Sequence, residues 1–157
     1  MNRIFTKLLF LSFIIIGCNS AKRNKLQETL IYITPKNEVV CIEIKDSSFV
    51  LNWIFFGKKK SSQINYFGII QFNGVTIKNE LKINKIVKNS IKTSNGKTIK
   101  TPIDQWPELE YNNKTKQITF YNDTLNLNSQ YSIIKTKDII DSHDNWNGNL
   151  IQLNDLR

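Results

Sequence analysis

Reactive and turn-forming residues are scarce in this chain. Its 157 residues include two cysteines, one histidine, three prolines and six glycines. Two thiols cannot supply a disulfide framework. The fold must therefore be stabilised by the burial of apolar side chains. The longest apolar run, residues 8–17, has only about half of the roughly 20 residues that a membrane-spanning helix requires. This run is therefore too short to cross a bilayer as a helix.

The first 18 residues have the layout of a secretory signal. Arg3 and Lys7 precede the apolar run without any acidic residue, and the run ends in Ile16-Gly17-Cys18. This ending resembles the lipobox of bacterial lipoprotein precursors, in which a small residue precedes the cysteine at the cleavage point. The resemblance implies that residues 1–17 are removed and that Cys18 carries a diacylglycerol. It also implies that the protein is anchored to a membrane of the bacterial cell envelope and faces the periplasm.

The remaining chain divides into a tether and one domain. Residues 18–26 are polar and lack periodicity, which predicts a lipidated tether, and residues 27–157 are sufficient for one β-rich domain with its own core. If Cys18 is lipidated, Cys41 has no intramolecular partner. Because Cys41 lies in the apolar run EVVCIEI, we expect it to behave as a small buried hydrophobic residue.

Positive charge is concentrated in the first part of the domain. Residues 19–101 hold 15 Lys and Arg against 5 Asp and Glu, whereas residues 102–157 hold 5 against 8. An exported lipoprotein rarely meets nucleic acid, so the sequence predicts binding to an acidic protein partner, with anionic headgroups and acidic glycans as alternatives. The residues that we expect to contact this partner are Lys58, Lys59, Lys60, Lys78, Lys82, Lys85, Lys88, Lys92, Trp53 and Phe56.

Alternation of apolar and polar residues predicts antiparallel strands. TLIYIT and EVVCIEI flank the turn Pro35-Lys36-Asn37 and form one hairpin, and SFVLNWIFF and INYFGIIQF flank GKKKSS and form a second with a lysine tip. SFVLNWIFF is apolar on both faces, which is typical of a strand inside a sandwich or barrel. The predicted fold class is therefore mainly β, as an antiparallel sandwich or small barrel.

One segment has a different period. In KNELKINKIVKNSIK the lysines recur at helical spacing, with Ile83, Ile86, Val87 and Ile91 opposite them. This pattern predicts one short helix near residues 79–88, although the β-branched residues favour a strand.

Turn residues predict the register of three further hairpins. A three-residue loop at Ser94-Asn95-Gly96, with Gly96 left-handed, places Ile91 opposite Ile99. A two-residue turn at Asn122-Asp123 places Phe120 opposite Leu125. A four-residue loop over residues 112–115 places Leu109 opposite Ile118, which makes residues 107–128 a three-stranded meander.

The candidate catalytic groups are few. His143 lies in DIIDSHDNWNGNL, which we interpret as an Asn-rich surface loop that lacks the charge for calcium. Asp104, Glu108 and Glu110 could supply paired carboxylates, but no cleft is indicated. The sequence therefore predicts no catalytic residue, no metal and no cofactor.

These observations favour a non-catalytic binding module for a protein partner. One specific form is an immunity or inhibitor lipoprotein that acts against an envelope-acting toxin or enzyme. The alternative is a β-barrel carrier of an apolar or lipid-like ligand in an aromatic-lined interior. A hydrolase that uses Asp104, Glu108, Glu110 or His143 is the third hypothesis.

Overall fold

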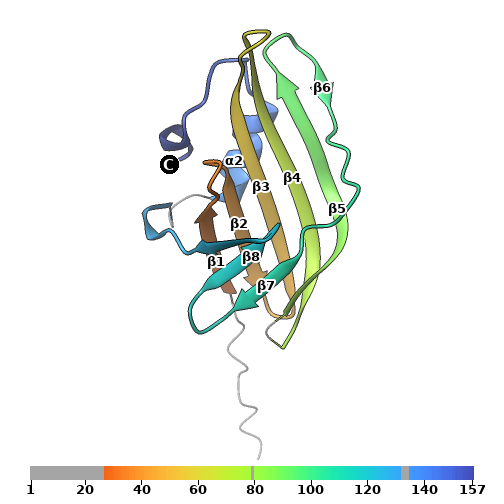
Figure 1. The fold of residues 1–157 in the computed structure, drawn as a ribbon, viewed down its shortest axis with the longest axis vertical. Coiled ribbons are helices and arrows are strands. Elements are labelled where there is room, and N and C mark those ends of the chain that lie inside the picture. Colours follow the sequence, from red (N-terminus) through yellow and green to blue (C-terminus); the bar gives the residue numbers. More distant parts are fainter. Residues whose placement is uncertain (1–26, 79, 132–134) are drawn as a thin grey trace, which may run out of the picture.

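The chain forms one antiparallel sheet that curls into a nearly closed, barrel-like structure. The computed structural model describes residues 27–78, 80–131 and 135–157. Within these residues the sheet order is β1-β2-β3-β4-β5-β7-β8-β9, and the short β6 also pairs with β5 (Figure 1). Tyr32 and Leu127 form an antiparallel bridge, and the Asn128 amide donates to the Ile31 carbonyl at 2.8 Å. These contacts join the two ends of the sheet, so the prediction of a mainly antiparallel β fold is confirmed.

The strands differ greatly in length. The long ones are β3 (Ser48–Lys59), β4 (Ile64–Ile77) and β5 (Glu80–Thr93), and β1 (Gln27–Ile33) and β2 (Val39–Lys45) have seven residues each. The remaining strands are β6 (Thr98–Ile99), β7 (Leu109–Asn112), β8 (Gln117–Phe120) and β9 (Asp123–Asn126). The long strands therefore extend beyond their shorter neighbours.

β3 is buried on both faces, as its sequence predicts. Phe49 and Leu51 point into the barrel, where they pack with Tyr32, Ile42 and Phe72, all at most 2 % exposed. Side chains therefore fill the barrel interior.

A second apolar layer covers the outer face of the sheet. It is made by Tyr131, which precedes α2 (Thr136–Asp144), by α2 itself and by the segment that follows it, with Tyr131, Ile139 and Leu156 against Ile54 and Phe67. Cys41 belongs to this layer and is fully buried, as expected.

The predicted helix near residues 79–88 is wrong, because Glu80–Thr93 is strand β5. The β4–β5 register shifts between Gln71 and Phe72 and between Asn73 and Gly74, so Asn84 and Val87 have no partner on β4. Each such bulge adds one residue to β5. Lysines three residues apart therefore face the same side: Lys82, Lys85 and Lys88 lie opposite Val75, Asn73 and Gln71.

The turn predictions had mixed outcomes. Ile91 lies opposite Ile99, and Gly96 has φ 80°, so the Ser94-Asn95-Gly96 loop is confirmed. The meander exists, but both predicted registers are wrong, because Phe120 pairs with Asp123 and Leu109 pairs with Phe120. The β8–β9 turn is Tyr121-Asn122, with φ 48° and 66°, because a two-residue hairpin turn of this type needs positive φ at both positions. The β7–β8 loop has the predicted four residues but occupies residues 113–116.

Two of the expectations concern residues that the structure does not describe. Residues 1–26, which include the signal, the tether and Cys18, lie outside the described residues. Among the helices of the described residues, none is both long enough and apolar enough to cross a membrane.

Candidate functional site

The long strands form an arm that extends past the rest of the barrel. We define the arm as residues 53–69 of the β3–β4 hairpin, the end of β5 and β6. β2 ends its pairing with β3 at Val39 opposite Ile54, whereas β3 and β4 stay paired to Lys59 and Ile64. Figure 1 shows this upper part of β3, β4 and β5 standing clear of β1, β2 and the β7–β9 meander. One face of the arm is therefore uncovered by other strands.

This uncovered face is apolar, and we call it the shelf. Phe55, Gly68, Ile91 and Ile99 lie opposite one another in one row across β3, β4, β5 and β6. Tyr66 adds a second ring in the next row, opposite Gly57. Phe55, Tyr66 and Ile91 are half-buried, and Ile99 is 50 % exposed. The shelf is continuous with the barrel interior, because Phe55 contacts Trp53 with ring centroids 5.3 Å apart.

Two glycines let the aromatic rings of the shelf lie flat on the neighbouring strand. A Cβ atom at Gly68 would lie 2.2 Å from Cε2 of Phe55, and one at Gly57 would lie 2.8 Å from the Tyr66 hydroxyl oxygen. Each ring therefore occupies the space that a side chain on the opposite strand would need.

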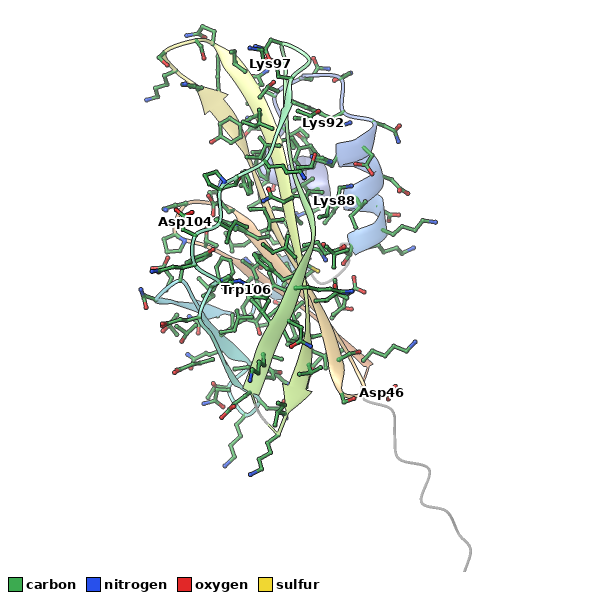
Figure 2. All side chains as sticks on the ribbon, turned by 90° about the vertical axis from the view of Figure 1, so that its right-hand side faces the viewer. Asp46, Lys88, Lys92, Lys97, Asp104 and Trp106 are labelled. Carbon is green, nitrogen blue, oxygen red and sulfur yellow. The ribbon has the colours of Figure 1, made fainter. Side chains whose placement is uncertain are left out.

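Lysines surround the far end of the shelf. Lys59 lies on the same side of β3 as Phe55, Lys58 lies on the other side, Lys60 is in the hairpin tip, and all three are exposed. Lys97 follows Gly96 in the neighbouring β5–β6 turn (Figure 2). Within the described part of the chain, none of these four lysines forms an ion pair.

The lysines of β5 and of the turn before it have two different environments. Lys78 is exposed in the β4–β5 turn at φ 57°, and Lys82 and Lys85 are exposed on the outer face of the strand. Lys88 instead donates to both carboxylate oxygens of Asp144 at 2.7 and 2.8 Å, and Lys92 donates to the Asp144 carbonyl at 2.5 Å. Lys88 and Lys92 therefore connect the end of α2 to β5 (Figure 2).

The two aromatic candidates lie on opposite faces of β3. Trp53 is half-buried at the foot of the shelf, whereas Phe56 packs against the layer that covers the outer face. The structure thus groups Trp53 with Lys59 on the side of the shelf and places Phe56 on the other side.

The chain enters the domain at the end opposite the lysine tip. Gln27 pairs with Lys45, and Lys45 pairs with Ser48 at the start of β3. β3 continues from there to Lys59. At a rise of about 3.3 Å per residue, the tip is about 36 Å from the entry point.

His143 is not in a surface loop, so that interpretation was wrong. It lies in α2, is completely buried, and its ring contacts Phe67 edge to face with centroids 5.0 Å apart. Its Nδ1 lies 3.0 Å from Asp144 Oδ1, and its Nε2 has no hydrogen-bond partner among the described residues. Burial lowers the pKa of His143, and the bond to Asp144 opposes this effect in part. A side chain without solvent access cannot exchange a proton with a substrate in this conformation.

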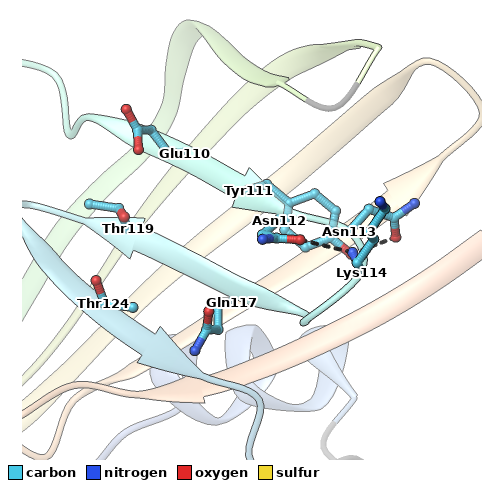
Figure 3. A pocket seen from close by; sticks show the side chains of 8 residues that line it. All are labelled: Glu110, Tyr111, Asn112, Asn113, Lys114, Gln117, Thr119 and Thr124. Carbon is cyan, nitrogen blue, oxygen red and sulfur yellow. Dashed lines mark hydrogen bonds between the residues drawn. The ribbon is translucent and has the colours of Figure 1, made fainter.

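The carboxylates of the hydrolase hypothesis lie elsewhere. Glu110 is in a concavity of about 570 Å³ on the outer face of the meander, which Figure 3 shows, with Thr119 and Thr124 beside it. Glu110 is the one carboxylate among its lining residues, whereas glycoside hydrolysis needs two. Figure 2 places α2 and the meander on opposite sides of the molecule, so His143 and Glu110 do not share a site.

The described residues contain no group of three or more His, Cys, Asp and Glu side chains that could hold a metal ion. The Cys41 thiol contacts the Thr136 hydroxyl at 3.3 Å, and burial raises its pKa to about 11. A thiol with such a pKa is a poor nucleophile at neutral pH.

Comparison of the chain with protein-family models, with curated proteins and with solved structures finds no match. The contact residues expected from the sequence include Trp53 and the lysine tip but not Tyr66, Ile99 and Lys97. The available signal was the length of the segments SFVLNWIFF and INYFGIIQF, which are longer than TLIYIT and EVVCIEI of the other predicted N-terminal hairpin.

Proposed function

We propose that this protein is a non-catalytic binding module that engages an acidic protein partner through the shelf and its lysine rim. In this proposal a lipid on Cys18 anchors the protein to a bacterial envelope membrane on the periplasmic side. The partner is an envelope-acting toxin or enzyme, which the module keeps from its target.

One observation carries the proposal: an uncovered apolar face adjoins four lysines that have no ion-pair partner within the described residues. Apolar patches with a charged rim are typical of protein interfaces, where the apolar centre supplies affinity and the rim supplies selectivity and association rate. Tyr and Trp are enriched among the residues that dominate binding energy, and the shelf offers Tyr66 with Trp53 at its foot.

The position of the shelf also suits a membrane-anchored protein. The tether would hold the entry end of the domain near the bilayer, since eight extended residues reach at most about 28 Å. The tip is about 36 Å further along β3, so the shelf would lie near the end of the domain that is distant from the lipid surface.

The carrier hypothesis receives less support. A carrier needs an internal cavity of several hundred cubic ångströms for a drug-sized or larger ligand. Here Tyr32, Phe49, Leu51 and Phe72, which are at most 2 % exposed, occupy the barrel interior.

Photo-crosslinking from the shelf tests the proposal. A photo-reactive residue is placed at Ile99, which is 50 % exposed on the shelf, and in a separate protein at Ile77, which is 49 % exposed in β4 outside the shelf. The two sites match in residue type and exposure, so they differ mainly in location. After irradiation in native membranes, we expect one acidic protein to be linked from position 99 and not from position 77.

Charge reversal provides a second test. The double substitution Lys59→Glu and Lys97→Glu should abolish this crosslink, and so should about 0.5 M salt, because salt screens exposed charge pairs. The substitution Lys82→Glu, on the outer face of β5, should leave the crosslink unchanged. The proposal is wrong if the same adduct forms from positions 77 and 99, or if charge reversal at the rim has no effect.

A further inference from the structure

Three aromatic rings form a corner at the mouth of the barrel. Trp53 lies 5.4 Å from both Phe120 and Tyr121, and Phe120 lies 4.9 Å from Tyr121, measured between ring centroids. The ring planes are inclined to one another by 50° to 80°, so the three rings face different directions. They line a cavity of about 220 Å³ together with Thr34, Lys36, Glu38 and Asp123.

Local backbone structure holds the corner open. Tyr121 is the first residue of the β8–β9 turn and has φ 48°, a conformation that an aromatic residue rarely adopts. This turn leaves the Tyr121 ring 37 % exposed at the rim, whereas Phe120 is 3 % exposed at the floor. The β1–β2 turn forms the facing wall, and the Glu38 amide donates to the Thr34 hydroxyl at 3.1 Å.

A half-buried carboxylate faces the rings without a full counter-charge. Glu38 Oε2 accepts a hydrogen bond from Trp53 Nε1 at 2.8 Å, but Glu38 forms no ion pair within the described residues. Burial raises the pKa of Glu38, and the Trp53 hydrogen bond and the charge of Lys36 oppose this shift in part. The titratable side chains that line the cavity are Glu38, Asp123, Lys36 and Tyr121. The lining thus has two carboxylates and one ammonium group.

Aromatic faces and a carboxylate together select for an organic cation. The faces of Trp, Tyr and Phe attract cations, and recognition of quaternary ammonium groups by several such rings is their best-known use. A primary ammonium has three N–H donors that need acceptors, whereas a quaternary ammonium has none and can contact ring faces directly. We propose that Trp53, Phe120 and Tyr121 bind a quaternary ammonium group, with Glu38 as its counter-charge. This cavity shares Trp53 with the foot of the shelf, but its other lining residues lie outside the shelf, and the inference does not depend on the proposed partner.

The test compares choline with 3,3-dimethylbutanol, which has the same shape but no charge. Both are titrated into the full-length protein in maltoside micelles, whose sugar headgroups carry no ammonium. The Trp53 indole N–H resonance, assigned with Trp53→Phe, reports binding. We expect a saturable shift with choline and an affinity at least about tenfold lower for 3,3-dimethylbutanol, because the attraction of rings and carboxylate requires the charge. Ethanolamine, a primary amine, should bind more weakly than choline.

Variants of the charged groups separate the site from a simple apolar depression. Glu38→Gln should weaken choline binding by about fivefold or more and leave the neutral analogue unaffected, and Lys36→Gln should tighten choline binding. Asp123→Asn, at an exposed position, gives a second variant in which the fold is not at risk, and it should weaken choline binding to a smaller degree. Equal affinities for choline and 3,3-dimethylbutanol, tighter binding of ethanolamine, or the absence of a saturable shift would each overturn the proposal.

Discussion

Gly68→Ala is expected to destabilise the domain through a single contact. The added Cβ would lie 2.2 Å from Cε2 and 2.4 Å from Cζ of Phe55, whereas ordinary carbon contacts begin near 3.4 Å. The Phe55 ring must therefore move by about 1 Å or more. Overpacking of this kind costs about 1–3 kcal/mol in the free energy of unfolding. Alanine is otherwise favoured over glycine in a strand by about 0.5–1 kcal/mol.

A double-mutant cycle isolates that contact. In a Phe55→Ala background the clash is absent, so Gly68→Ala should become neutral or slightly stabilising, and the coupling energy should equal the overpacking cost of about 1–3 kcal/mol. Urea unfolding of the four proteins, followed by circular dichroism, measures each term. The same cost for Gly68→Ala in both backgrounds would refute the reasoning, since it would show that Phe55 is not the cause.

The same substitution at the other two glycines of this hairpin should change the free energy of unfolding by different amounts. Gly57→Ala should cost less than Gly68→Ala, because the new Cβ meets only the hydroxyl end of Tyr66 at 2.8 Å. Gly74→Ala should cost more, because its Cβ would lie 2.3 Å from the Lys82 carbonyl oxygen, which belongs to the backbone. The reverse order would contradict the geometry.

Three further predictions concern the layer under α2. Burial lowers the pKa of His143 in the folded protein. The unfolded chain therefore binds a proton at this side chain near pH 6.5, whereas the folded protein does so only at a lower pH. The free energy of unfolding should consequently fall as the pH falls below about 6.5. His143→Phe should flatten this dependence between about pH 7 and pH 5, and urea titrations with equal slopes for both proteins would contradict it. Asp144→Asn removes the partner of Lys88 and should cost about 0.5–1 kcal/mol, because Asp144 is 51 % exposed. Hydrogen exchange should then accelerate in α2 and not in β3. Because Cys41 is fully buried, its thiol should react with a disulfide reagent only as fast as the protein unfolds, and rapid labelling would argue against the buried thiol.

Local rules in the sequence were sufficient for most of the strands. The two-sided apolar pattern of SFVLNWIFF predicted a strand that is buried on both faces, and Asn95-Gly96 predicted the register that joins Ile91 to Ile99. Both signals depend on residues within one hairpin. They could therefore be read without knowing the rest of the fold.

The errors came from features that depend on distant residues. The bulges at Asn84 and Val87 gave the lysines of β5 a spacing of three residues, and that spacing imitates a helix. His143 was assigned to a loop because its neighbours are Asp and Asn, yet it lies in α2, and its ring contact with Phe67 on β4 is one of the contacts that hold this helix on the sheet. The tertiary contact, and not the local composition, decides the conformation there.

The candidate site was predicted only in part for a similar reason. Trp53 and Lys59 could be identified from their own segment as aromatic and basic residues near a hairpin tip. Whether Tyr66 and Ile99 are covered depends instead on how far β2 and β7 extend along β3 and β5, and that is set by turns far away in the sequence.

The entry of the chain beside Ser48 has a mechanical consequence. In the proposed arrangement, in which a lipid anchors the segment before Gln27, a partner bound to the arm would apply force along the strands, because β1 starts at the end opposite the tip. Such a load shears all seven residue pairs between β1 and β2 together, whereas a load perpendicular to the strands would open them one at a time. The orientation that presents the shelf to a partner is thus also the one in which the first strand resists extraction best.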